Sequence, residues 1–589
     1  MTRIPLRFLA ALALIALSMF AAACGGDDSD EGGSAQSQDS AQEGTPAEGK
    51  QGGRLTMLSA SDVDYLDPGH TYYTFGFQVQ QPTHRTLYGF FPGDNVNAKP
   101  DLAESEPQIS EDKKTITVKL RPNIKFAPPV NRVITSKDVK YAIERAFTEN
   151  VGGQYTNYFS SIEGAPEEPG DFKAIPGLET PDDQTLVIKL SEPLGVQVAA
   201  ALVMPITAPV PQEYAEKFDK ENPSTYNTNA VASGPYMVRN DAEGKSVGYE
   251  AGKSIELVRN PNWDKNSDPR PAYVDEILIR TNASDAGVAA RQVLEGQSMI
   301  HDTNPPANVL AQVVRRNKDQ LATIPGGAFR WFPLNTTIKP LDDINVRKAI
   351  LAGFDKDAAR KARGGEYVGE IGTHFLPPEF PGFDESGGAK GFGQDYMSNP
   401  KGDPALAAEY MKKAGYASGK YEGDDELLMV TANADPGKAQ AEVARAQLEK
   451  LGFKIEFRTV PQDAVYTEWC QVPPKKVAIC GSAGWFKDYT DPQSMLEVTF
   501  KGSEINKSDN NNNLPQLDVP EIDKAMEEAN LLEGDERNKA WANVNKMIVD
   551  QAPAVPFVWD NTNVVHSQNV NGVMNPYSTV LDLAFTSIK

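Results

Sequence analysis

The side chains that could catalyse a reaction are few in this sequence and lie far apart. The chain of 589 residues has three cysteines and five histidines. No histidine belongs to an HExxH motif or an HxH pair, no GxSxG turn precedes a helix, and the sequence has neither a phosphate-binding loop nor a GxGxxG turn after a strand. The spacing therefore predicts no catalytic residue, no metal site and no cofactor. We expect structural or surface roles for the histidines, which are His70, His84, His301, His374 and His566.

The first cysteine, Cys24, follows a short apolar segment. Arg3 and Arg7 give a positive start, and residues 8–23 form an apolar run that is shorter than the roughly 20 residues of a membrane helix. This pattern is typical of a secretory signal peptide, here residues 1–23. Small residues before a cysteine resemble a bacterial lipoprotein signal, which implies a lipidated Cys24 at the mature N-terminus. The alternative is ordinary signal cleavage beside a free cysteine.

The segment after the lipidated cysteine predicts a flexible tether. Residues 24–53 contain no large apolar side chain, so they cannot bury enough surface to offset the entropy of ordering. The folded body is therefore expected to begin near Arg54, and lipidation would hold it at the outer face of the cell membrane.

The other two cysteines, Cys470 and Cys480, lie close together in the sequence. In an exported protein such a pair favours a disulfide. Closing a loop of about ten residues would add roughly 2–3 kcal/mol of stability in the chain-entropy account. The bond would hold the segment that precedes Trp485; the alternative is two free buried thiols.

Composition indicates a soluble globular chain that does not bind nucleic acid. Apolar residues make up 40% and charged residues 24%, and 81 acidic against 58 basic side chains give a net charge of −23. A nucleic-acid binder needs a basic surface to displace counterions. The length suggests several domains' worth of chain.

Hydrophobic periodicity predicts an α/β body. Strands are expected at 115–121 and 185–190 in one sheet, and a capping box at Thr135 and Asp138 starts a helix that reaches Phe147. The second half alternates helix and strand, which favours an open α/β sheet with ligand contacts at the loop ends. Its expected elements are a helix from Pro404 to Ala414, a strand at 427–431, a helix at 436–451 and a strand at 453–460. The polar run 506–513 is expected to be a solvated loop.

Read from end to end, the chain resembles extracellular solute-binding protein family 5, the oligopeptide- and dipeptide-binding proteins of ABC importers. Each matching segment is weak alone, but together and in order they are specific. The segments are Leu66-Asp67-Pro68, Pro100-Asp101-Leu102-Ala103-Glu104-Ser105, 115–121, 135–147, Ser233-Gly234-Pro235-Tyr236, Arg259-Asn260-Pro261-Asn262-Trp263, 340–350, Ala414-Gly415-Tyr416 and 484–492. The chain departs from the family at Phe126-Ala127-Pro128-Pro129, where members often carry F-x-D-G.

The resemblance implies a bilobed periplasmic-binding-protein-like α/β fold of cluster C type. Lobe I would span 54–325, with an extra subdomain at about 90–210, and would be completed by the return segment 555–589. Lobe II would span 326–554. A ligand would bind in the cleft, and hinge closure would present both lobes to the permease.

The resemblance also implies site residues. Asp488 falls at the family position whose carboxylate pairs with the ligand α-ammonium, with Trp485 lining the cleft and Gly484 allowing close backbone approach. The alternatives are a turn-forming Asp488 and a core Trp485. Phe329, Arg330 and Trp331 at the expected lobe crossing are candidates for an aromatic wall and a cation, or for plain interlobe packing. The two family anchors for a ligand carboxylate do not carry over, because their positions hold Ser482 and Leu351.

The implied function is that of a lipid-anchored extracellular substrate-binding protein of an ABC importer, without enzyme activity. It would act as a monomer, capture peptides by closing its lobes, and deliver them to the permease and ATPase subunits. The alternatives are the same fold binding a sugar, an opine or a metal chelate, and a ligand-sensing lipoprotein without transport.

Overall fold

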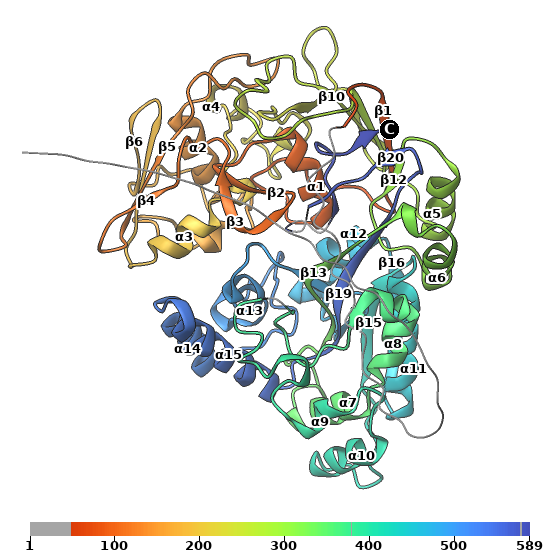
Figure 1. Ribbon diagram of the computed structural model, residues 1–589. Helices are drawn as coiled ribbons and strands as arrows, with labels where there is room; N and C mark the ends of the chain where they lie inside the picture. The colour runs from red at the N-terminus through yellow and green to blue at the C-terminus, as the bar shows by residue number, and fades with distance from the viewer. Residues whose placement is uncertain (1–48, 379, 576, 578–579) are drawn as a thin grey trace, which may run out of the picture. The chain divides into compact units, whose positions relative to one another are not determined.

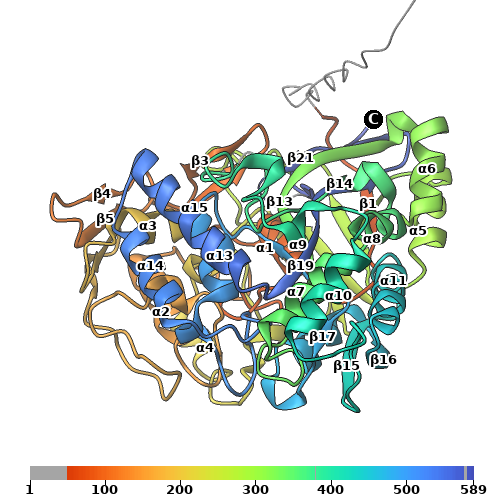
Figure 2. The same ribbon diagram turned by 90° about the horizontal axis from the view of Figure 1, so that it is seen from below.

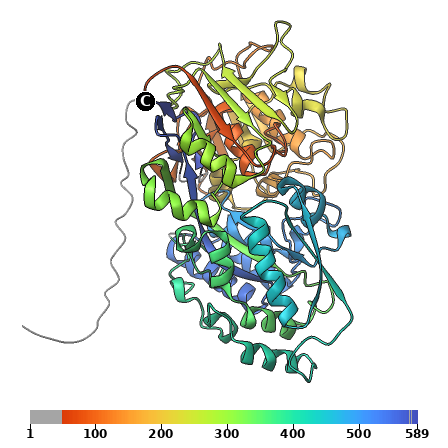
Figure 3. The same ribbon diagram turned by 90° about the vertical axis from the view of Figure 1, so that its right-hand side faces the viewer.

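The computed structural model of the chain describes residues 49–378, 380–575, 577 and 580–589. Its sheets gather in two lobes, with the red-to-yellow part of the chain in one and most of the teal and blue part in the other (Figures 1 and 3). We call the lobe with strands β1 and β5 the first lobe and the lobe with strand β15 the second lobe. The long strands β13 (Leu321–Pro333) and β19 (Ala554–Val565) lie between them.

A mixed sheet forms the base of the first lobe. Its order is β12-β1-β11-β10-β8, with β9 also paired to β10. Strand β1 is parallel to β11 and β12, and β10 is antiparallel to β11, β8 and β9. Leu581 and Leu583 near the C-terminus share a buried core with Leu55 of β1, so the chain end returns to this lobe. The strands are β1 (Arg54–Leu58), β8 (Tyr236–Val238), β9 (Tyr249–Glu250), β10 (Ser254–Arg259), β11 (Glu276–Arg280) and β12 (Met299–His301).

The antiparallel sheet predicted from two alternating strands is confirmed. Its order is β4-β5-β7-β6, and β5 (Thr115–Lys119) pairs directly with β7 (Thr185–Lys189). Ile116 and Val118 of β5 and Leu186 and Ile188 of β7 are buried, as the two-residue alternation requires, and Val187 on the other face is half-buried. The outer strands are β4 (Gln108–Ile109) and β6 (Leu178–Asp182).

Helix α2 (Ser136–Ala146) covers this sheet and begins where the capping box predicts. The backbone N–H of Thr135 donates to Asp138 Oδ2 at 2.7 Å, so the acid at the third helical position closes the first turn. Arg132 then forks onto the same carboxylate at 2.8 and 2.6 Å, which holds the strand-to-helix connection in place.

The second lobe contains a sheet of parallel strands in the order β16-β15-β17, where an open α/β sheet was predicted. The expected helix–strand–helix–strand series is confirmed to within one or two residues at most ends. Its elements are α10 (Pro404–Lys413), β15 (Glu426–Ala432), α11 (Gly437–Lys450) and β16 (Lys454–Val460). The strand β17 (Ile479–Cys480), which was not predicted, completes the sheet. Asp403 caps α10 by accepting from the backbone N–H groups of Ala405 and Leu406, both at 3.0 Å.

A third sheet joins the lobes, in the order β14-β19-β13-β18. Strand β13 pairs antiparallel with β19 along almost its whole length and with β18 (Gly484–Phe486) on its other edge. The short strand β14 (Gly369–Glu370) completes the sheet.

The remaining helices surround these sheets, and α13, α14 and α15 pack together in the second lobe (Figure 2). They are α1 (Thr74–Thr83), α3 (Gly195–Ala201), α4 (Gln212–Ala215), α5 (Ala286–Glu295), α6 (Ala307–Arg316), α7 (Ile344–Gly353), α8 (Lys356–Arg363), α9 (Asp395–Ser398), α12 (Gln462–Ala464), α13 (Pro492–Phe500), α14 (Pro520–Asn530) and α15 (Gly534–Asp550). Two-stranded ribbons join β2 (Tyr88–Phe91) to β3 (Asp94–Pro100), β20 (Val570–Asn571) to β23 (Ser587–Ile588) and β21 (Met574–Asn575) to β22 (Val580–Leu581). In the described part of the chain, no helix has the length and apolar character needed to cross a membrane.

A disulfide joins Cys470 to Cys480, with their Cα atoms 6.2 Å apart. It ties the end of a π-helical turn, Val465–Cys470, to strand β17. That turn also carries Tyr466, whose hydroxyl accepts a hydrogen bond from the backbone N–H of Gly484 at 3.1 Å. The bond therefore fixes the turn against the strand that leads to Trp485.

Removing this disulfide should lower stability without changing the fold. The double substitution Cys470→Ser and Cys480→Ser is expected to reduce the free energy of unfolding by about 2–3 kcal/mol, because the unfolded chain regains the entropy of an open loop. Urea unfolding followed by circular dichroism measures this loss. A reducing agent should lower the free energy of unfolding of the wild type by the same amount and leave that of the double variant unchanged. Equal stability of the two proteins without reducing agent would contradict the expectation.

Candidate functional site

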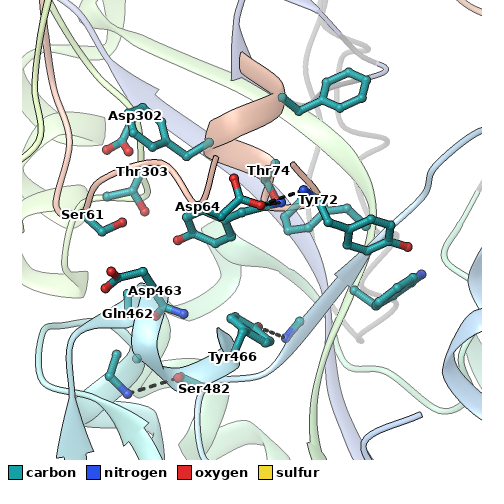
Figure 4. A pocket seen from close by; sticks show the side chains of 18 of the residues that line it. Ser61, Asp64, Tyr72, Thr74, Asp302, Thr303, Gln462, Asp463, Tyr466 and Ser482 are labelled. Carbon is teal, nitrogen blue, oxygen red and sulfur yellow. Dashed lines mark hydrogen bonds between the residues drawn. The ribbon is translucent and has the colours of Figure 1, made fainter. Parts of the chain in front are cut away.

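A cavity of about 280 Å³ lies between the lobes and is lined by residues of both. Figure 4 shows Ser61, Asp302 and Thr303 of the first lobe facing Gln462 and Asp463 of the second lobe across it. Its volume is close to the lower end of ordinary ligand pockets, roughly 300–1,000 Å³. The site therefore suits a small solute that touches both lobes.

The second lobe supplies loops at the carboxyl ends of its parallel strands. Ala432 ends β15 and Ser482 follows β17, and both line the cavity. The Ser482 hydroxyl accepts from the backbone N–H of Ala432 at 3.2 Å, which ties the two loops together (Figure 4). The cavity therefore lies at the edge of the sheet where the helix–strand alternation predicts ligand contacts.

The first lobe presents tyrosines from a turn that Asp64 organises. Asp64 Oδ2 accepts from the backbone N–H groups of Tyr72 and Tyr73 at 2.7 and 2.9 Å, and Oδ1 accepts from the Thr71 hydroxyl at 2.7 Å. Burial raises the pKa of Asp64, and these hydrogen bonds oppose the rise. Asp64 therefore has a positioning role: it fixes the turn that places both tyrosines at the cavity.

Asp488 is an acid surrounded by phenols. Its Oδ2 accepts from the hydroxyls of Tyr72 and Tyr158 at 2.9 and 2.6 Å, and its backbone carbonyl accepts from Tyr577. Burial raises the pKa of Asp488 to about 7, while the Tyr158 and Tyr72 hydrogen bonds oppose the rise. No cation of the described residues acts on this pKa. Such a carboxylate gains most from a cationic ligand.

Trp485 and Gly484 line the same cavity, next to Asp488. The Trp485 indole N–H donates to the Ser494 carbonyl at 2.8 Å, which fixes the ring 5.8 Å from that of Tyr72. A Cβ on Gly484 would come within 2.8 Å of Arg330 Cζ. The missing side chain at 484 therefore makes room for the Arg330 guanidinium, a role different from the close ligand approach expected from the sequence.

Phe329 and Trp331 do not form the expected aromatic wall. Both are 0% exposed and neither lines the cavity; their rings pack edge to face, 5.3 Å apart, and Trp331 also packs against Phe500. Only Arg330 of the expected trio reaches the cavity, because alternate side chains of a strand point to opposite faces. The aromatic lining comes instead from Tyr65, Tyr72, Tyr73, Phe75, Phe77, Tyr155, Tyr466, Trp485, Phe486 and Tyr577.

Two residues that the sequence analysis did not identify meet Arg330 at the cavity wall. Asp560 Oδ2 accepts from Arg330 Nε at 2.7 Å, and Asp560 Oδ1 accepts from Arg363 Nε at 2.8 Å. Burial would raise the pKa of Asp560, but Arg363 and Arg330 hold it below its usual range. The three side chains come from β13, α8 and β19, so no local motif signals their contact.

The polar run 506–513 is only partly the solvated loop that we expected. Its first half is exposed, but Asn511 and Asn513 are buried and Asn512 lines the cavity. The Asn513 amide donates to the Leu517 carbonyl at 2.9 Å and accepts from its N–H at 3.0 Å. The Asn511 amide donates to the Asn513 carbonyl at 2.8 Å, so the buried amide nitrogens of Asn511 and Asn513 both have backbone partners within the loop.

Sequence comparison identifies known proteins that are similar to this chain. The family model described as bacterial extracellular solute-binding proteins, family 5 middle, matches residues 97–507. The chain is 24% identical over 505 residues to the oligopeptide-binding protein OppA of Bacillus subtilis, which covers 82% of this chain and 84% of that protein. It is 24% identical over 543 residues to a dipeptide-binding protein of Pseudomonas aeruginosa, covering 89% of this chain and 93% of that one.

Solved structures confirm the predicted fold class. The periplasmic binding protein DppA of Helicobacter pylori, in complex with the peptide STSA, matches with a TM-score of 0.75 at 20% identity, over 92% of this chain and 98% of that chain. The fold is therefore that of the bilobed periplasmic binding proteins.

The raised pKa of Asp488 predicts a pH-dependent stability difference. Between the ordinary value of 3.8 and about 7, the folded state binds more protons than the unfolded state, so wild-type stability falls as pH rises through this range. Asp488→Asn keeps a neutral group beside the phenols and should be more stable at pH 8 by up to about 4 kcal/mol, at 1.36 kcal/mol per pKa unit. The difference should vanish near pH 4.

Chemical unfolding at pH 4, 6 and 8 measures this difference. Asp171→Asn, at an exposed residue, is the matched control and should show no such trend. A pH-independent difference between wild type and Asp488→Asn would mean that Asp488 titrates at its ordinary pKa.

Proposed function

Because the chain belongs to the bacterial extracellular solute-binding proteins of family 5, we propose that it captures peptides between its lobes and delivers them to the permease of an ABC importer. The carboxylate of Asp488 carries the proposal. It lines the cavity, has phenols as partners, and acquires no cation from the described chain. The free α-ammonium group of a peptide supplies that cation.

The peptide binds through its ammonium end first. The ammonium donates charge-assisted hydrogen bonds to Asp488, and these are roughly twice as strong as neutral ones. Tyr72 and Tyr158 keep the carboxylate oriented while the ligand ammonium group moves from water into the cavity. The tyrosine and tryptophan rings around the cavity give adaptable apolar surface for varied side chains.

Lobe closure follows from where the contacts lie. Asp488 comes from the segment after β18, whereas Tyr72 precedes α1 of the first lobe. A ligand held from both sides binds the closed arrangement more tightly than the open one, and this difference in affinity shifts the equilibrium toward closure. The closed protein then docks on the permease as a monomer.

The lobe boundaries expected from the sequence belong to this proposal. Lobe I comprises 54–325 and 555–589, with the extra subdomain at about 90–210, and lobe II comprises 326–554. The boundaries place the two crossings at β13 and β19, whose antiparallel pairing supports a hinge of two adjacent strands. The strand pair β5 and β7 falls inside the extra subdomain.

The proposal also includes a lipid anchor on the outer face of the cell membrane. Cys24, the signal peptide 1–23 and most of the tether 24–53 lie outside the described residues. The support is the sequence pattern together with the extracellular family. Transfer of a captured peptide to a membrane permease is faster from a tethered donor, because the tether raises the local concentration.

Blocking lipidation should release the protein. Cys24→Ser is expected to move most of the protein from the membrane fraction to the medium or to leave an unprocessed precursor, as immunoblotting of fractionated cells would show. Ser34→Ala in the tether is the matched control and should stay with the membrane. Equal membrane association of Cys24→Ser and wild type, with both proteins processed to the same mature size, would contradict the anchor.

Peptide binding should depend on the Asp488 charge. Isothermal titration calorimetry at pH 8 against di- and tripeptides with varied side chains is expected to give one-to-one binding, which Asp488→Asn weakens at least tenfold because a desolvated charge pair is worth roughly 2–5 kcal/mol. N-acetylation of the peptide, which removes its ammonium charge, should weaken binding to the wild type at least tenfold and should change binding to Asp488→Asn little. Asp171→Asn should bind like wild type.

The same titration with sugars, an opine and a metal chelate tests the other ligand classes. Binding of one of these and of no peptide would overturn the peptide proposal while leaving the solute-binding fold intact.

A further inference from the structure

Three ionisable side chains from distant parts of the chain meet at one wall of the cavity and leave an excess of positive charge. Asp560 Oδ2 accepts from Arg330 Nε and from Arg363 Nη2, both at 2.7 Å, and Oδ1 accepts from Arg363 Nε at 2.8 Å. Two guanidinium groups thus share one carboxylate. Because arginine stays protonated in proteins, the group carries a net charge of about +1.

The two arginines differ in how many of their guanidinium nitrogens have hydrogen-bond partners among the described residues. The Arg363 side chain is 6% exposed and also contacts the Gln440 side-chain oxygen through Nη1 at 3.3 Å. The Arg330 side chain is 18% exposed, lines the cavity, and is bound in the described structure through Nε alone. Among the described residues Nη1 and Nη2 of Arg330 have no hydrogen-bond partner, so both are available as donors to a ligand in the cavity that Arg330 lines.

The position of the Arg330 guanidinium is set by its neighbours. It stacks over the Phe486 ring, with its Cζ atom 4.9 Å from the ring centroid. The absence of a side chain at Gly484 leaves the space that this group occupies. Arg363 alone already satisfies both oxygens of Asp560, so Arg330 can engage a ligand without leaving a buried acid unpaired.

We propose that Arg330 binds the terminal carboxylate of the peptide whose ammonium group binds Asp488, so that the cavity selects short zwitterionic peptides. The planar guanidinium fork matches a carboxylate with two parallel hydrogen bonds. The ligand anion also balances the net positive charge of the three side chains, and a partly buried charge is costly to leave unpaired. This inference rests on the peptide binding proposed above.

The strand register limits the ligand length. Arg330 pairs with Gly484 between β13 and β18, and Asp488 follows Gly484 by four residues. At about 3.3–3.6 Å per residue, the Cα atoms of Gly484 and Asp488 are at most about 14 Å apart. The same rule applied to an extended ligand allows at most about four residues between its charged ends. The small cavity volume agrees with this length.

The test compares a peptide with its C-terminal amide. The di- or tripeptide that binds the full chain most tightly in the calorimetric panel is titrated at pH 8 as the free acid and as the amide. We expect wild type to bind the acid at least tenfold more tightly. Arg330→Gln should lose this preference: its affinity for the acid falls at least tenfold, while its affinity for the amide stays within about threefold of the wild-type value.

Arg458→Gln is the matched control, because Arg458 lies on β16, pairs with Glu456 and does not line the cavity. It should keep the full preference for the acid. Gly484→Ala, which retains the Arg330 charge but crowds its guanidinium, should reduce the preference.

Equal wild-type affinities for acid and amide, or an unchanged preference in Arg330→Gln, would overturn the carboxylate role and leave peptide binding standing. If the wild type bound no peptide, free or amidated, the proposed function and this inference would both be overturned. The wild-type comparison needs no substitution, so it decides the question even if Arg330→Gln does not fold.

Discussion

The antiparallel pairing of β13 with β19 is the constraint on which the candidate site depends. Its register sets Phe329 opposite Trp559 and Arg330 opposite Val558, and it brings Asp560 close to Arg330. The third strand, β18, continues into the segment that carries Asp488. One ladder between the lobes therefore determines where a basic and an acidic anchor lie. It also buries Phe329 and Trp331 away from the cavity.

The cavity that results is electrically polar. Arg330, Arg363 and Asp560 leave positive charge at one wall, while the Asp488 carboxylate lies beside tyrosine hydroxyls at another. Neither arrangement is favourable in itself, because charge removed from water is costly unless it is paired. Both become favourable when one solute supplies an ammonium and a carboxylate at the matching spacing. These charges therefore lower the stability of the ligand-free protein and favour binding of a zwitterionic solute.

Much of the fold could be predicted because its signals are local. The Thr135 capping box starts α2, Asp403 and Pro404 start α10, and two-residue alternation predicts β5 and β7. The order of family segments predicted the bilobed class and brought Asp488 to attention. The contact of Arg363 with Asp560 joins residues almost 200 positions apart, and sequence patterns do not encode such a contact. The direction of Phe329 and Trp331 depends on which face of β13 meets the core, and the burial of Asn511 depends on the conformation of its loop.

The phenols around Asp488 have a consequence for discrimination among solutes. Tyr72 and Tyr158 already give this carboxylate two neutral donors. A hydroxyl group of an incoming sugar would exchange one neutral donor for another of similar strength, with little net gain. An ammonium group gains the Coulomb attraction that no hydroxyl provides. The tyrosine hydroxyls therefore compete with neutral solutes for Asp488, and a positively charged solute is favoured over them.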